Sequence, residues 1–253
     1  HKFGNKYPNC SYGCGFESWL GSKWSKPYNS FGNGAAMRVS PVVDLCESRL
    51  EVSYVSKESA LCTHNHPEGI KGAKVTATCA WMAKRGASKK EIEEYACRKY
   101  PSDEYMFPVS MSLKELREKY RWNETCQGSV PVAIRCFLDS EDYESFIRNV
   151  LSLPCDTDTL CAIGGGIAEE FYHGTGFNAD KLMREYLDEY LYEIVKAYRR
   201  IRNYEEENIK SFINGNDADD LTYRLSKCSK VYGRFHDTEI GIKSKVRGDY
   251  MER

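Results

Sequence analysis

The sequence of 253 residues lacks any long apolar run, and no stretch approaches the ~18 apolar residues that a membrane-spanning helix needs. It also lacks an excess of charge of one sign, because 36 Lys and Arg oppose 37 Asp and Glu and leave a net charge of −1. These absences predict no membrane partner and no bulk nucleic-acid partner. The start of the sequence lacks a basic segment followed by an apolar one, so we expect no secretory signal.

The 11 cysteines lack the paired spacing of metal ligands. Cys10 and Cys14 are close together in a Gly-rich segment, but no second pair or nearby His completes a zinc site. Several other cysteines fall inside apolar helical patterns, where a free thiol behaves as a small buried hydrophobe: Cys62, Cys79, Cys97, Cys136 and Cys161. This usage predicts a reducing compartment, and we expect a cytoplasmic protein.

Alternating strand-type runs are also missing, so the sequence predicts an all-α fold. Residues 1–34 are rich in Gly, Ser, Asn, Tyr and Trp and are expected to be irregular. Apolar spacing and capping signals predict helices over 50–61, 70–84, 88–96, 113–120, 130–138, 143–151, 160–172 and 181–198, with Ser140 as the cap of the sixth. We predict one domain over residues 1–200 and a charge-rich C-terminal appendage over 201–253.

Three consecutive glycines, Gly164 to Gly166, lie inside the predicted helix 160–172. Each costs about 1 kcal/mol of helix propensity relative to Ala. Close packing of the helix backbone against another element would offset this cost. The glycines therefore predict a tight helix contact.

The segment Asp156-Thr157-Asp158-Thr159 directly precedes that glycine-rich stretch. Two carboxylates two residues apart, with a Thr hydroxyl, are the hard oxygen ligands that suit Mg²⁺, Mn²⁺ or Ca²⁺. Asp and Thr are also favoured N-cap residues, and negative charge stabilises a helix N-terminus. The segment alone leaves a cation site and a helix cap as alternatives.

The segment from Ser30 to Arg38 is a Gly-rich loop that runs into a helix. Small residues expose backbone N–H groups that receive phosphate, and Arg38 is a candidate charge for an anion. An ordinary turn before a helix is the alternative.

Two further segments carry reactive side chains. His64 and His66 lie in Thr63-His64-Asn65-His66-Pro67-Glu68-Gly69, where contact with a substrate or a capped turn is favoured over metal binding, since no third soft ligand is near. Cys126 opens Cys-Gln-Gly-Ser-Val-Pro and is either a nucleophile or a buried thiol.

In this order, the four segments resemble the ADP-ribosylglycohydrolase family, which includes the dinitrogenase reductase-activating glycohydrolase and the mammalian ADP-ribosyl-acceptor hydrolases. The resemblance spans roughly residues 7–198. It implies a compact orthogonal bundle of α-helices with two Mg²⁺ ions, or Mn²⁺, in a cleft. There the bond between ADP-ribose and a modified side chain or other acceptor is hydrolysed. The implied partner is an ADP-ribosylated protein or a small ADP-ribose conjugate, and we expect a monomer.

The resemblance also assigns roles to residues of this sequence. Asp156 and Asp158 are implied to be catalytic and, with Thr159, to bind metal, which would position the ribose hydroxyls and lower the pKa of a bound water. The substrate would be held by these residues: Ser30, Phe31, Gly32, Asn33, Gly34, Met37, His64, His66 and Tyr172. The loop from Ser30 to Gly34 would cradle the pyrophosphate, the two histidines would contact the phosphates or the ribose, and Tyr172 would stack on the adenine.

The sequence departs from the family pattern in its metal ligands. The family completes its site with an N-terminal Thr-Asp-Asp-Thr segment, and none precedes Tyr7. The nearest match lies in the appendage, at residues 234–238, and Pro154-Cys155 replaces two usual glycines. Because the sequence opens on His1 rather than Met, we expect the missing ligands upstream. The alternatives are a pseudoenzyme that binds ADP-ribose or a related nucleotide, and a structural protein that reuses the fold.

Overall fold

The computed structural model describes residues 1–213, and within them the predicted all-α class is confirmed. The chain divides into two compact units, residues 1–179 and 180–253. The predicted boundary at residue 200 stays a prediction. The possible ligand segment at 234–238 lies outside the described residues.

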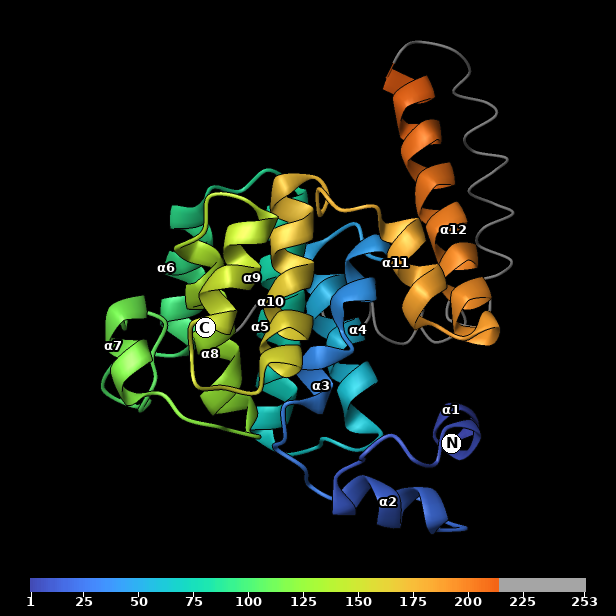
Figure 1. Ribbon diagram of the computed structural model, residues 1–253, viewed down its shortest axis with the longest axis horizontal. Helices are drawn as coiled ribbons and strands as arrows, with labels where there is room; N and C mark the ends of the chain where they lie inside the picture. The colour runs from blue at the N-terminus through green and yellow to red at the C-terminus, as the bar shows by residue number, and fades with distance from the viewer. Residues whose placement is uncertain (214–253) are drawn as a thin grey trace, which may run out of the picture. The chain divides into compact units, whose positions relative to one another are not determined.

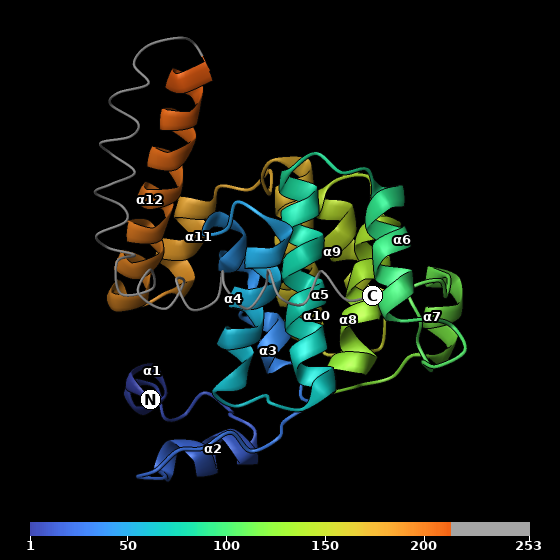
Figure 2. The same cartoon turned by 180° about the vertical axis from the view of Figure 1, so that it is seen from behind.

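Three helices form the centre of the first unit (Figures 1 and 2). They are α5 (Pro67–Lys84), α8 (Cys126–Leu138) and α10 (Thr157–Tyr172), and each packs against the other two. Their contact faces are almost wholly buried and include Val75, Cys79, Val130, Ile134, Leu160, Ile163 and Ile167. At about 25 cal/mol per Å² of apolar surface, burial of these side chains is the main favourable term for the unit.

Shorter elements cover this centre. Helix α4 packs on α5, α9 packs on α8 and α10, and α3 packs against all three central helices. The remaining bounds are α3 Gly34–Met37, η1 Ser40–Asp44, α4 Arg49–Leu61, α6 Lys89–Lys99, α7 Leu113–Lys119 and α9 Tyr143–Leu151. The central helices are thereby held in place on several sides.

The glycines of α10 occupy close contacts, as the sequence predicts. A Cβ atom on Gly164 would lie 2.6 Å from the Phe146 ring and 3.0 Å from the Ala133 carbonyl oxygen. A Cβ on Gly166 would overlap the Ser40 hydroxyl. The glycines therefore let α8, α9 and the 3₁₀ turn η1 approach the α10 backbone.

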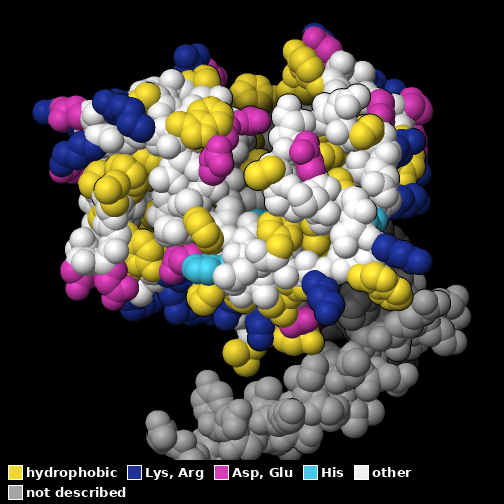
Figure 3. Space-filling view, turned by 90° about the horizontal axis from the view of Figure 1, so that it is seen from below, with side chains coloured by type: hydrophobic (Ala, Val, Ile, Leu, Met, Phe, Trp, Pro, Cys, Tyr) yellow, Lys and Arg dark blue, Asp and Glu magenta, His cyan; other side chains and the backbone are white. Residues whose placement is uncertain are grey.

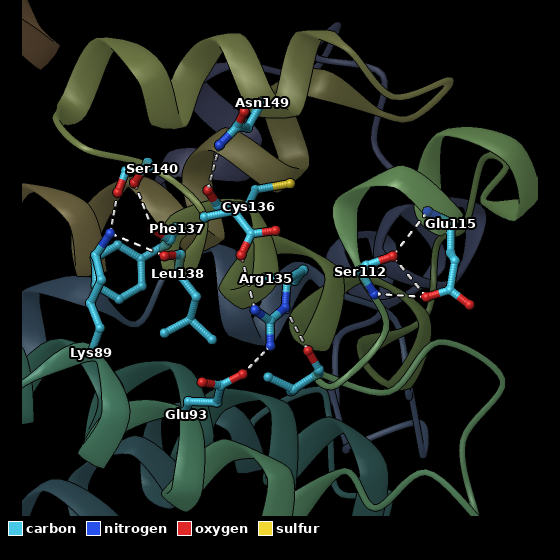
Figure 4. Close-up of polar contacts among 12 residues, drawn as sticks. Lys89, Glu93, Ser112, Glu115, Arg135, Cys136, Phe137, Leu138, Ser140 and Asn149 are labelled. Carbon is cyan, nitrogen blue, oxygen red and sulfur yellow. Dashed lines mark hydrogen bonds and ion pairs between the residues drawn. The ribbon is translucent and has the colours of Figure 1, made fainter.

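Two buried or half-buried cations join α6 to α8 (Figure 4). Lys89 donates to the carbonyl oxygens of Leu138 and Ser140, at the C-terminal end of α8, where cations are stabilising. Arg135 donates to the Val109 carbonyl oxygen at 2.7 Å and pairs with Glu93 and Asp139, and its pair with Glu93 can be followed in the same view. These contacts fix the end of the bundle where α8 finishes.

The prediction that residues 1–34 are irregular is wrong, because this segment contains α1 (Lys2–Lys6) and α2 (Cys14–Gly21). The His1 ring stacks on Trp19 with centroids 4.2 Å apart, and Leu20 covers Gly4. Tertiary contacts between the two short helices outweigh their weak propensity.

Three other predictions about helix ends are wrong. Asp142, rather than Ser140, caps α9 by accepting from the Ser145 N–H, while the Ser140 hydroxyl donates to the Phe137 carbonyl oxygen. The predicted starts at residues 70 and 130 are late, because α5 begins at Pro67 and α8 at Cys126. Proline suits the first turn of a helix, where no N–H is needed.

The second unit contains α11 (Ala179–Tyr186) and α12 (Glu189–Ile213), where the sequence predicts one helix over 181–198. The break occurs because Asp188 accepts from the Leu191 N–H at 2.8 Å and starts a new helix. The Tyr192 hydroxyl then donates to Asp180 at 3.0 Å, which joins α12 to α11. Within the described part of the chain, no helix has both the length and the apolarity to cross a membrane.

Candidate functional site

The N-terminal ends of α5, α8 and α10 gather near α3, on the lower side of the bundle in Figure 1. Figure 3 views this side, where hydrophobic, acidic, basic and histidine side chains are interspersed. Helix N-termini carry partial positive charge and unpaired N–H groups, so this end favours anions. All predicted site residues except Tyr172 lie on segments that meet here.

The Gly-rich loop at 30–34 is anchored by backbone hydrogen bonds to two distant segments. The Asn33 N–H donates to the Glu124 carbonyl oxygen and the Cys126 N–H donates to the Phe31 carbonyl oxygen, both at 2.9 Å. These bonds flank an isolated antiparallel bridge between Gly32 and Thr125. The loop thus has a fixed conformation before any ligand arrives.

This anchoring consumes donors that the sequence assigned to phosphate. Ser30 donates its N–H to the Thr63 carbonyl oxygen at 3.4 Å, Gly32 donates to the Ser30 hydroxyl at 3.2 Å, and Asn33 donates to Glu124. Within the described residues, Phe31 and Gly34 are left as loop N–H donors with no hydrogen-bond partner. An anion would therefore meet two loop N–H groups rather than five.

Two glycines of α5 let the loop and α8 lie on its first turns. A Cβ on Gly69 would lie 2.6 Å from the Ser30 carbonyl oxygen and 3.0 Å from the His64 Cβ. A Cβ on Gly72 would overlap the Cys126 thiol. Glycine at these two positions, one helical turn apart, is what brings three segments together.

His64 is 6% exposed and lies directly under the loop. Its Nδ1 is 2.6 Å from the Thr63 hydroxyl, and its Nε2 lies 3.6 Å from where a Cβ on Gly34 would sit. Burial, and then the nearby Arg38 charge, lower the pKa of His64 from 6.5 to about 4. The ring is therefore neutral at neutral pH.

His66 and Phe31 lie beside each other at the surface of the same region. His66 is the N-cap of α5, and its Nδ1 accepts from the Glu68 N–H at 3.1 Å. The Phe31 ring is 44% exposed and its centroid is 5.2 Å from that of His66. His66 therefore caps a helix, as one interpretation predicts. It also lies at the surface beside an exposed aromatic ring, as contact with a substrate requires.

Asn33 is buried and ties the loop to α8. Its amide donates to the Asn123 carbonyl oxygen at 3.3 Å and to the Ser129 hydroxyl at 3.1 Å. A cavity of about 380 Å³ adjoins Asn123. It is lined by Glu68, Glu104, Tyr105, Met106, Phe107, Asn123, Thr125, Gln127 and Gly128.

Sequence reasoning missed most of this lining. Glu68 accepts from Lys71 and from the Tyr105 hydroxyl, the latter at 3.0 Å, so these three side chains form one polar cluster on the cavity wall. In the sequence, only the position of Glu68 and Lys71 beside the two histidines pointed to this cluster. Tyr105 lies in a segment interpreted as a polar connection.

The acidic pair begins α10. Asp156 is its N-cap residue, but its side chain makes no capping hydrogen bond, and the Thr159 N–H donates instead to Asp158 at 2.9 Å. Partial burial and the Asp158 carboxyl raise the pKa of Asp156, while the hydrogen bond from Asp156 lowers the pKa of Asp158. Two carboxyls that face each other in this way are what a divalent cation would neutralise.

Thr159 joins the acidic segment to the Gly-rich one. Its hydroxyl is buried and donates to the Met37 sulfur at 3.6 Å. Two of the predicted blocks, 122 residues apart in sequence, therefore touch. Within the described residues no group of three or more Cys, His, Asp or Glu side chains is arranged to hold a metal, and the role of Asp156 and Asp158 as metal ligands stays a prediction.

Tyr172 is not brought to this site. It lies at the C-terminal end of α10, about 21 Å from Asp158 at 1.5 Å per residue. Its hydroxyl donates to the Ser140 carbonyl oxygen at 2.8 Å, and Lys89 lies over its ring. The position of Tyr172 gives the predicted adenine stacking no geometric support.

The side chains of the two other candidates, Cys126 and Arg38, form hydrogen bonds within the protein. The Cys126 thiol is buried and donates to the Gly32 carbonyl oxygen at 3.1 Å, and burial raises its pKa to about 12. A thiol is nucleophilic as its thiolate, so this geometry favours the buried-hydrophobe interpretation. Arg38 donates to the Ser59 carbonyl oxygen and the Thr63 hydroxyl, both at 3.1 Å.

These features can be compared with known proteins. A sequence model of a protein family, described as ADP-ribosylglycohydrolase, matches residues 8–203. The chain belongs to the ADP-ribosylglycohydrolase family.

Relatives carry the same type of name. The chain is 28% identical over 184 residues to the ADP-ribosylhydrolase ARH3 of Danio rerio, a match that covers 56% of this chain and 50% of that protein. It is 26% identical over 229 residues to the ADP-ribosylhydrolase ARH3 of Homo sapiens, which covers 68% and 63%. The chain thus spans half to two thirds of the length of these relatives.

A solved structure titled as an ADP-ribosylglycohydrolase-related protein complex resembles the fold. The TM-score is 0.53 with 22% identity, over 78% of this chain and 65% of that one. At this identity the match supports the all-α ADP-ribosylglycohydrolase fold and nothing finer.

Proposed function

We propose that this chain carries the substrate-binding part and one wall of the metal site of a Mg²⁺-dependent hydrolase that releases ADP-ribose from a modified protein or small conjugate. The observation that carries the proposal is the Thr159–Met37 contact. It sets a pair of facing carboxyls beside a preformed Gly-rich loop at one end of a family-specific bundle. Names of relatives agree with this activity, but they describe those longer proteins.

The donor set fits a hard cation. Asp156 and Asp158 supply carboxylate oxygens that repel each other, and Thr159 supplies a hydroxyl. The described residues provide only this wall, so a two-ion site needs ligands from elsewhere. When bound, Mg²⁺ would hold the ribose hydroxyls and acidify a water.

The chain's own residues would position the substrate. The N–H groups of Phe31 and Gly34 would donate to the pyrophosphate, and neutral His64 lies directly beneath the loop to add a side-chain contact. The exposed Phe31 ring offers an apolar surface beside His66 for a flat group. The ribose would then face the end of α10 where the carboxyls lie.

The decisive experiment measures the release of free ADP-ribose from ADP-ribosylated arginine and serine peptides at millimolar Mg²⁺. A parallel reaction contains EDTA, and calorimetry measures the affinity for ADP-ribose itself. Release that depends on Mg²⁺ supports hydrolysis and identifies the acceptor. Absence of both release and binding would overturn the proposal.

A second candidate is a binding protein that holds ADP-ribose without hydrolysing it. The observation that favours it is the pair of carboxylates, which are too few for two ions within the described residues. Binding in the calorimeter with no release at any Mg²⁺ concentration would select this candidate. Restoration of release by an added upstream Thr-Asp-Asp-Thr segment would return the assignment to the hydrolase.

A further inference from the structure

The buried Thr63 hydroxyl lies beneath the loop, between the exposed Arg38 guanidinium and the buried His64 imidazole. Arg38 Nη2 is 3.1 Å from Thr63 Oγ1, and Thr63 Oγ1 is 2.6 Å from His64 Nδ1. Thr63 is 1% exposed and His64 is 6% exposed, so water has little access to either group. The three side chains form a linear hydrogen-bonded chain.

Donor counting fixes the direction of this chain. A guanidinium only donates, so Thr63 Oγ1 accepts from Arg38. The hydroxyl then has one proton to give, and His64 Nδ1 is its nearest acceptor. The Cys62 sulfur, at 3.9 Å, is a much weaker alternative, and its own proton goes toward the Ser59 carbonyl oxygen at 3.5 Å.

The opposite arrangement would leave a buried donor poorly paired. If His64 Nδ1 carried the hydrogen and donated to Thr63, the Thr63 proton would have only the distant sulfur to receive it. An unpaired buried donor loses its hydrogen bond to water without replacing it, which disfavours this tautomer. A flipped ring would place a carbon where Nδ1 stands and lose the 2.6 Å contact.

We propose that Arg38 and Thr63 are positioning residues that hold neutral His64 as the tautomer with its hydrogen on Nε2, so that this N–H donates to a phosphate oxygen over the loop. Nε2 faces the loop at 3.6 and 3.7 Å from where Cβ atoms on Gly34 and Gly32 would sit. The ligand role of Nε2 rests on the proposed function, but the tautomer itself does not.

Arg38 then has a different role from that of a direct charge for an anion, which its place after the Gly-rich loop suggests. Its guanidinium donates to the Ser59 carbonyl oxygen, near the end of α4, and to Thr63. Arg38 therefore acts on an anion through Thr63 and His64, by directing a neutral donor at it. A neutral donor keeps the site free of a buried histidine charge.

The tautomer can be read directly by NMR of protein with ¹⁵N-labelled histidine at pH 7. A long-range proton–nitrogen correlation separates protonated from bare ring nitrogens, and the His64 signals are those lost in His64→Gln among the 5 histidines. We expect the hydrogen on Nε2 in the native protein. We expect a mixture of tautomers in Thr63→Val and in Arg38→Met, and the native pattern in Thr63→Ser.

The native amide spectrum shows whether each variant is folded. A hydrogen on Nδ1 in the native protein overturns the inference. An unchanged pattern in both Thr63→Val and Arg38→Met also overturns it, because neither residue would then select the tautomer.

A binding arm tests the consequence for the ligand. Thr63→Val should weaken the binding of ADP-ribose and of inorganic pyrophosphate by about three- to ten-fold, the loss expected for one misdirected hydrogen bond. The affinities of Thr63→Ser should stay within about two-fold of the native values. Native affinity in Thr63→Val would overturn the ligand role. If the native protein binds neither probe, the proposed function fails, while the NMR result still decides the tautomer.

Discussion

The loop at 30–34 and the acidic turn at 156–159 differ in how completely their polar groups are satisfied. Hydrogen bonds fix the loop to two distant segments, and a neutral histidine lies beneath it. The acidic turn has two carboxyls that oppose each other and an N-cap side chain with no capping bond. The loop is organised before a ligand binds, whereas we propose that a cation completes the acidic turn.

Asp158→Ala should have the largest effect, because it removes half of the acidic pair. We expect the rise in melting temperature caused by Mg²⁺ to vanish and any ADP-ribose release to fall by more than about 100-fold. Binding of ADP-ribose without Mg²⁺ should persist, since the loop is untouched. Glu118→Ala, exposed on α7, is the matched control. An unchanged Mg²⁺ shift in Asp158→Ala would remove this residue from the site.

His64 should make the loop side sensitive to acid. Its folded pKa is about 4, below the usual 6.5, so the unfolded chain takes up the proton first as the pH falls. The stability that depends on neutral His64 is therefore present above pH 6.5 and is lost toward pH 4. The loss should be roughly 3 kcal/mol at 1.36 kcal/mol per pKa unit.

Urea unfolding of the native protein and of His64→Gln between pH 4 and 7.5 measures this loss. The native protein should lose its advantage over the variant as the pH falls. Parallel curves for the two proteins would show that the ring is not held neutral.

Gly69→Ala should loosen the loop. Its new Cβ would press on the Ser30 carbonyl oxygen and on His64, so we expect a loss of about 1–3 kcal/mol of stability and about ten-fold weaker ADP-ribose binding. Gly21→Ala is the control, because nothing lies within 4 Å of its added Cβ. Chemical denaturation and calorimetry measure both effects. Equal changes in the free energy of unfolding of the two variants would contradict the close approach of Gly69 to the Ser30 carbonyl oxygen.

Tyr172→Phe should have the smallest effect, because Tyr172 belongs to neither region. Losing the hydroxyl bond to Ser140 should cost about 1 kcal/mol of stability. ADP-ribose affinity should stay within about two-fold in this variant and in Tyr172→Leu, which removes the ring. A large loss of affinity in Tyr172→Leu alone would reinstate adenine stacking.

Local signals in the sequence predicted local structure well. The helix predicted from residue 88 forms and is capped by Ser88 with Glu91, because a capping signal involves residues within one turn. The three glycines of α10 meet close neighbours, because only close packing offsets their cost in helix propensity. The break at Asp188 was missed because apolar spacing continued across it. Helices α1 and α2 were missed because contacts between them, rather than propensity, stabilise them.

The candidate site shows the same limit. The motifs located the loop, both histidines and the acidic pair, and their roles as ligands stay predictions. No local pattern indicated that Asn123 and Glu124 would pair with the loop, because that pairing joins segments 90 residues apart. The family resemblance also grouped Tyr172 with these residues, although Tyr172 and Asp158 lie at opposite ends of α10.

The bridge between Gly32 and Thr125 also bears on how the protein folds. Because the bridge joins residues far apart in the sequence, we expect it to form late, after the helices between Gly32 and Thr125 have packed. The loop would therefore gain its ligand-ready form only near the end of folding. Recovery of ADP-ribose binding during refolding should lag behind recovery of helical signal, so binding would report completion of the native fold.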